Sequence, residues 1–61
     1  EAEQYLRRAL DKHFDAEIAA HLGEVLWVRG RQDEARAVWQ DALRRAPDHT
    51  LLKQVIERFS K

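Results

Sequence analysis

Apolar side chains recur every three or four positions along nearly the whole chain, the spacing that lines one face of an α-helix. The pattern occurs in four stretches, and the breaks between them fall near residues 13–15, at Gly30 and at Pro47. Only two glycines and one proline occur among the 61 residues, whereas alanine, leucine, arginine and glutamate, which favour helices, are frequent. Spacing and composition together predict an all-α fold of four short helices.

Capping chemistry sets the boundaries of the first two helices. The first helix is expected to end near Lys12 or His13. The carboxylate of Asp15 can accept the free amide hydrogens at the start of the second helix. Gly30 suits the left-handed conformation that closes a helix, so the second helix should run to about Arg29.

The third and fourth helices are separated by a proline. A tight polar turn at residues 31–34 leads into the third helix and places acidic side chains in its first turn. Pro47 cannot continue that helix, and Asp48 beside it is predicted to cap the fourth. The second helix is apolar around most of its circumference, with Trp27 and Val28 lying off the main stripe. We therefore expect it to lie between other helices.

Charge and composition exclude several function classes. Eleven basic and eleven acidic side chains give a formal net charge of zero, without the excess of positive charge typical of proteins that bind nucleic acid or anionic membranes. The apolar runs are far too short to span a bilayer, so membrane insertion is not expected. The chain begins at Glu1 without a methionine, which suggests a piece of a longer protein, and nothing in it indicates a compartment.

The residues also argue against catalysis. The chain has no cysteine, which excludes disulfides, a thiol nucleophile and cysteine-based metal sites. Its one serine, Ser60, is the second-last residue, and no glycine-rich phosphate loop is present. We therefore expect neither an enzyme nor a bound cofactor.

The two halves of the chain are related by an internal repeat. A shift of 33 positions places Ala2 on Ala35 and aligns the apolar stripes of the first two helices with those of the last two. The other aligned pairs are Tyr5 and Val38, Leu6 and Trp39, Ala9 and Ala42, Leu10 and Leu43, Ile18 and Leu51, Ala19 and Leu52, Leu22 and Val55, and Leu26 and Phe59. This period is typical of a repeat made of two helices.

Seven residues in the middle of the chain lie at fixed offsets within this period: Leu22, Gly23, Gly30, Ala35, Trp39, Ala42 and Pro47. In order and spacing they resemble the signature of the tetratricopeptide repeat (TPR). The resemblance implies antiparallel helical hairpins of an α-solenoid, with residues 16–49 as one full repeat. Residues 1–13 are then the second helix of a preceding repeat and residues 50–61 a C-terminal capping helix. The sequence from Glu17 to Asp48 resembles the last repeat of bacterial TPR scaffold proteins.

Each signature residue also has a physical reason. Gly23 and Ala35 would let two antiparallel helices approach closely, and Trp39 would fill the space between units. Ankyrin repeats share the 33-residue period, but the chain lacks their Thr-Pro-Leu-His signature. We therefore favour the TPR-like arrangement.

The resemblance implies a partner-binding groove. In this family the exposed face of a repeat's first helix lines a concave groove that holds a peptide or a helix. The corresponding residues are Glu17, Ala20, His21, Glu24 and Trp27. Trp27 would be the anchor and the two glutamates would favour a basic or amphipathic partner. The alternative for Trp27 is packing against the first helix of the neighbouring unit. The function expected is non-catalytic protein–protein interaction within a scaffold.

Two alternatives remain open. Fewer than two repeat units offer a small core, so the chain could self-associate through its terminal helices, with exchange of a hairpin at the loop near Gly30. The stripes that would pair are Tyr5, Leu6 and Leu10 with Leu52, Ile56 and Phe59. Alternatively, the side chains of Glu17, His21 and Glu24 share one helix face and could bind a metal ion, although such a site needs further ligands from another helix. A solvated polar face is the more common outcome for such a pattern.

Overall fold

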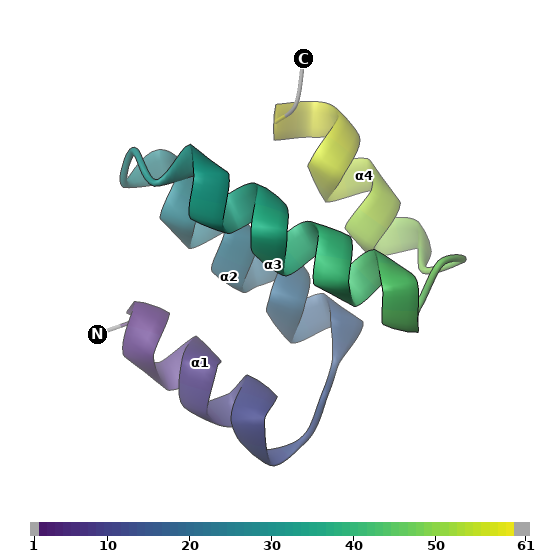
Figure 1. Ribbon diagram of the computed structural model, residues 1–61, viewed down its shortest axis with the longest axis horizontal. Helices are drawn as coiled ribbons and strands as arrows, with labels where there is room; N and C mark the ends of the chain where they lie inside the picture. Colours follow the sequence, from purple (N-terminus) through teal and green to yellow (C-terminus); the bar gives the residue numbers. More distant parts are fainter. Residues whose placement is uncertain (1, 60–61) are drawn as a thin grey trace.

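The computed structural model describes residues 2–59, which form four α-helices joined by short loops. They are α1 (Ala2–Lys12), α2 (Ala16–Val28), α3 (Gln32–Arg45) and α4 (Thr50–Phe59). The predicted all-α fold is confirmed. Residue 1 and residues 60 and 61, including Ser60, lie outside the described residues. Figure 1 shows α2 and α3 side by side, with α1 and α4 on opposite sides of this pair.

The predicted boundaries around α2 are confirmed. The Asp15 carboxylate accepts a hydrogen bond of 2.9 Å from the backbone N–H of Glu17 and so caps the helix. After α2, Gly30 adopts a φ of +84°, a left-handed conformation in which other residues are strained. The loop therefore turns back within three residues, and α3 begins at Gln32.

The predicted cap of α4 is wrong by one residue. The backbone N–H of Leu52 donates to Nδ1 of His49, at 3.3 Å, and the helix begins at Thr50. His49 is therefore the N-cap residue, while the side chain of Asp48 is exposed and lies 4.0 Å from Nζ of Lys53. Pro47 ends α3 as expected. Two residues, Asp48 and His49, then precede α4, and the side chain of the second faces the start of that helix.

The core is built around α2. This helix packs against α1, α3 and α4, so the prediction that it lies between other helices is confirmed. Most of the buried side chains of α2 are small, which lets its neighbours approach closely. The buried apolar residues of the core are Ala16, Ala19, Ala20, Leu22, Leu26, Ala35, Trp39, Ala42, Leu52 and Val55.

At Gly23 a large side chain of α3 packs directly on the backbone of α2. The indole of Trp39, only 1% exposed, lies directly over this glycine. A Cβ atom built on Gly23 would lie 1.9 Å from Nε1 of Trp39. Gly23 therefore gives Trp39 room to pack on α2, and Trp39 is a core residue.

An ion-pair cluster attaches the start of α1 to the loop between α2 and α3. Glu3 is only 8% exposed, and its carboxylate lies 2.6 Å from a guanidinium nitrogen of Arg31, 3.1 Å from Arg7 and 3.9 Å from Arg29. Glu34 binds the other edge of the Arg31 guanidinium and lies 3.6 Å from Arg7. Glu3 and Arg7 are four residues apart, the spacing of an ion pair within one helix, but Arg31 is 28 residues from Glu3 and follows no helical periodicity.

This cluster makes the fold sensitive to acid. Hydrogen bonds from Arg31 and Arg7 lower the pKa of Glu3, and a hydrogen bond from Arg31 lowers that of Glu34. Since both carboxylates stay ionised to lower pH in the folded chain than in the unfolded one, their contribution is complete above the ordinary pKa of about 4.5 and is lost as the pH falls further. We expect the urea midpoint to decrease between pH 5 and pH 3.

The variant Glu3→Gln should show a smaller decrease over the same range, because one of the two carboxylates is gone. Glu57→Gln, at an exposed position of α4, serves as the control and should follow the original chain. If Glu3→Gln loses stability in parallel with the original chain, the cluster is not the source of the acid sensitivity.

Candidate protein-binding surface

One face of α2 stays uncovered by the other helices. Glu17 and His21 are exposed on it, Glu24 is partly exposed, and Val28 at the end of the helix is 73% exposed. Successive members of this set are three or four residues apart and therefore lie on one side of a helix. We refer to Glu17, His21, Glu24 and Val28 as the α2 strip. Three of its members are residues that the sequence predicted for the groove.

A shallow hollow of about 270 Å³ adjoins the C-terminal half of the strip. It is lined by His21, Glu24, Val25, Val28 and Arg29. The two valines give it an apolar surface, while Glu24 and Arg29 bring opposite charges to its edge. Val25 and Val28 were not predicted as site residues. The available signal was the position of Val28 away from the apolar stripe of its own helix.

Ala20 is a correction to the predicted groove. It is 0% exposed, and its carbonyl oxygen accepts a hydrogen bond of 3.3 Å from Nε1 of Trp39. Ala20 lies on the side of α2 that faces α3, where its small side chain makes room for the indole. It is therefore a core residue with no surface for a partner.

Trp27 also lies apart from the strip. Its ring is half-buried and stacks on Trp39 of α3, with 5.7 Å between ring centroids, and lies 6.3 Å from the ring of Phe59 in α4. The guanidinium of Arg36 covers its ring at 5.2 Å. Trp27 therefore joins α2 to both following helices. This geometry supports the packing alternative over the expected role as partner anchor, because α4 corresponds by the repeat to the first helix of the next unit.

The acidic residues of the strip do not assemble a metal site. Within residues 2–59, the structure contains no group of three or more histidine, cysteine, aspartate or glutamate side chains placed to hold a metal ion. Glu17, His21 and Glu24 share a face, but they project from a single helix.

The stripes predicted for self-association are largely used within the chain. Leu52 is fully buried, and Tyr5 alone among them is largely exposed. The other residues of these stripes pack, partly buried, against the core: Leu6, Leu10, Ile56 and Phe59. Pairing of two chains through these leucines and Phe59 would therefore require α1 or α4 to leave its own core.

Neither the lengths of the helices nor comparison with known proteins adds a further candidate site. Within residues 2–59, each helix is too short or too polar to cross a membrane. Comparison of the chain with protein-family models, curated proteins and solved structures finds no match. The resemblance to TPR proteins therefore stays a prediction from the sequence, and the function has to be argued from the surface of the four helices.

Proposed function

We propose that this chain is a non-catalytic protein-interaction module, part of a helical-repeat scaffold, that binds a basic amphipathic helix or peptide on the α2 strip. The observation that carries the proposal is the exposure of Val28, at 73%, on the same face as Glu17 and Glu24. An exposed apolar side chain beside carboxylates offers both contact area and charge selection to a partner.

The packing of α2 supports this role. Because α1, α3 and α4 hold the helix on its other sides, its free face needs no rearrangement to bind. A surface that is already ordered loses little conformational entropy on binding. The α2 strip is therefore already ordered before a partner binds, unlike a segment that folds only on binding.

The chemistry of the strip indicates the kind of partner. Apolar side chains of a partner would cover Val25 and Val28, and lysine or arginine side chains would approach Glu17 and Glu24. Exposed charge pairs contribute mainly to selectivity and association rate, whereas the buried apolar area contributes most of the affinity. Because the strip is short, we expect weak, transient binding, as for other small interfaces.

The test uses a synthetic 18-residue peptide with leucine on one helix face and lysine on the other. Glu17→Lys combined with Glu24→Lys should weaken its binding at least tenfold, measured by calorimetry at about 0.15 M salt, while the circular dichroism of the chain stays the same. A peptide with glutamate in place of lysine should bind the original chain more weakly.

The matched control carries the same change in net charge at Asp48 and Glu57, both exposed and outside the strip. Binding of the lysine peptide to this control should stay within about threefold of the original affinity, since distant surface charges are screened by salt. Equal losses in both double variants, or no loss in either, would refute the proposed site.

A further inference from the structure

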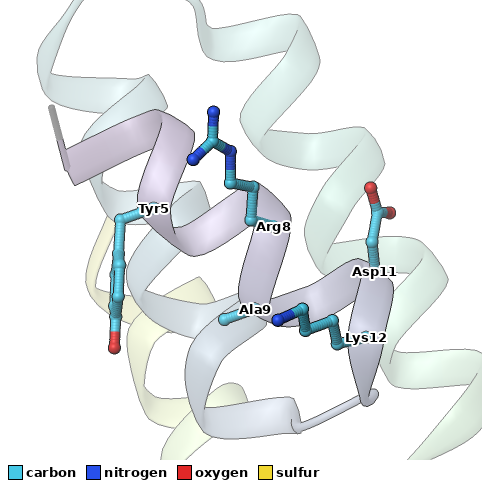
Figure 2. A pocket seen from close by; sticks show the side chains of 5 residues that line it. All are labelled: Tyr5, Arg8, Ala9, Asp11 and Lys12. Atoms are coloured by element: carbon cyan, nitrogen blue, oxygen red, sulfur yellow. The ribbon is translucent and has the colours of Figure 1, made fainter.

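α1 differs from the other three helices in how it is held. Within residues 2–59 it lies alongside α2 and alongside no other helix, and it contributes no buried apolar side chain. Leu6 and Leu10 pack against the core but stay partly buried. Figure 2 shows the outer side of the helix, where a hollow of about 510 Å³ is lined, within the described residues, by α1 alone. α1 therefore has a single apolar seam, and that seam is incompletely covered.

The residue that α1 does bury is charged. Glu3 is 8% exposed, and its carboxylate faces arginines from two parts of the chain. Arg31 lies at 2.6 Å and Arg29 at 3.9 Å, both in the loop after α2, while Arg7 lies at 3.1 Å within α1 itself. Arg7 also lies 3.6 Å from Glu34 at the start of α3. The N-terminal half of α1 is thus attached to the rest of the chain by ion pairs.

The apolar core is formed without α1. Every buried apolar residue in the described part of the chain belongs to α2, α3 or α4, and these three helices pack on one another. The stacked rings of Trp27, Trp39 and Phe59 also join the same three helices. Loss of α1 would expose its two leucines and their contact surface on α2, but it would open none of the contacts among the other three helices.

Release of α1 would also break only some of the ion pairs. Glu3 and Arg7 are both in α1, and Arg31 binds Glu34 three residues further along the chain. The pairs that join α1 to the rest are those of Glu3 with Arg31 and Arg29, and that of Arg7 with Glu34. Because Arg31 keeps Glu34 as a partner and Glu3 gains water, release of α1 strands neither of these two charges.

We propose that α1 is a releasable helix, which undocks from α2 in acid or at high salt while α2, α3 and α4 stay folded. Released α1 loses its helical structure, because an isolated helix of 11 residues is marginal in water. The side of α2 that α1 covers then becomes accessible. This inference concerns the attachment of α1 and does not depend on the function proposed for the α2 strip.

The ion pairs determine which conditions favour release. Hydrogen bonds from Arg31 and Arg7 lower the pKa of Glu3, so this carboxylate stays ionised to lower pH in the docked state than in the released state. Its contribution to docking is complete above the ordinary pKa of about 4.5 and is lost as the pH falls further. Salt weakens the same pairs, because the side chains of the three arginines are 40–47% exposed and counterions can screen them.

Amide hydrogen exchange of the full chain at pH 6, followed residue by residue by NMR, tests the proposal. The amides of Leu6, Ala9 and Leu10 should have protection factors at least tenfold lower than those of Trp39 and Ala42 in α3. Their protection should also depend less steeply on low concentrations of urea, because release of one helix exposes less surface than unfolding of the whole chain.

A change at Glu3 tests whether the ion pairs hold α1. Glu3→Gln leaves the arginines without their buried carboxylate and should lower the protection of the α1 amides a further tenfold or more. Raising the salt from about 0.05 M to about 0.5 M should lower this protection at least threefold in the original chain and less in Glu3→Gln. Asp11→Asn is the matched control, since it removes the same charge from an exposed position of α1, and it should leave the protection within about threefold.

A change in α4 separates release of α1 from unfolding of the whole chain. Val55 is 9% exposed in the core, and α4 lies on the opposite side of the α2–α3 pair from α1 (Figure 1). Val55→Ala should lower the protection of Trp39 and Ala42 at least fivefold through lost core packing. The protection of the α1 amides should stay within about twofold, because their exchange does not require the core to open.

Three results would overturn the proposal. Equal protection and equal urea dependence in α1 and α3 would mean that α1 unfolds only together with the whole chain. Equal losses of protection in both helices of the Val55→Ala variant would lead to the same conclusion. Equal effects of Glu3→Gln and Asp11→Asn on the α1 amides would show that the ion pairs of Glu3 do not hold the helix in place.

Discussion

Replacing Gly23 with alanine should destabilise the fold by about 3 kcal/mol or more, although alanine is the better helix former. The added Cβ would lie 1.9 Å from Nε1 and 2.3 Å from Cε2 of Trp39, so the indole has to move. Trp39 is buried and stacks on the rings of both Trp27 and Phe59, so its movement disturbs two further contacts. Urea unfolding followed by circular dichroism measures the loss.

A double-mutant cycle identifies the cause of that loss. In a Trp39→Leu background, the alanine at position 23 meets a smaller side chain, so it should cost at least about 1 kcal/mol less than in the original chain. Gly30→Ala is the control, because a Cβ there has no atom within 4 Å and its cost of about 1 kcal/mol comes from the φ of +84° alone. Higher stability of the Gly23→Ala chain would contradict the helix contact described here.

The local features of this fold could be predicted from the sequence because they depend on neighbouring residues. Asp15 caps α2, Gly30 closes the turn after it, and Pro47 ends α3. Each acts on backbone groups within a few positions. Gly23 could also be predicted, since only a very small residue inside an apolar helix allows a large one to pack on its backbone.

Features that depend on which helix covers which face could not be predicted in the same way. Apolar spacing assigns Tyr5 and Leu52 to the stripes of their helices, but one is exposed and the other fully buried. The apolar spacing within one helix does not indicate where the neighbouring helices pack on it. Pairing of Glu3 with Arg31 was missed for the same reason, since the fold brings the loop after α2 to the start of α1.

The candidate site was predicted in part. Glu17, His21 and Glu24 lie together on the uncovered face of α2. Ala20 and Trp27 were assigned to that face as well, yet they lie on the sides that contact α3 and α4. A difference of one residue rotates a side chain by about 100° around a helix, so a face several residues wide extends easily into the core. Whether its edge is exposed is decided by the neighbouring helices.

Replacing Trp39 with alanine should produce the largest loss of stability, about 3–5 kcal/mol. The indole is 1% exposed, stacks on Phe59 at 6.1 Å between centroids and donates its N–H to the Ala20 carbonyl. A domain of 61 residues has an expected unfolding free energy of about 3–9 kcal/mol in total. The variant should therefore be largely unfolded at 25 °C, or unfold at a much lower urea concentration, as circular dichroism would show.

Trp27→Ala is the matched control, since it removes the same side chain from a half-buried position in the same aromatic cluster. This variant should lower the free energy of unfolding by only about 1–2 kcal/mol, because it removes less buried apolar area and leaves the hydrogen bond between Trp39 and Ala20 in place. A large difference between the two variants would locate the stability of the module in the contact of Trp39 with α2. Equal losses would mean that stacking among the rings of Trp27, Trp39 and Phe59 holds α4 on the α2–α3 pair, and that the close approach at Gly23 contributes little.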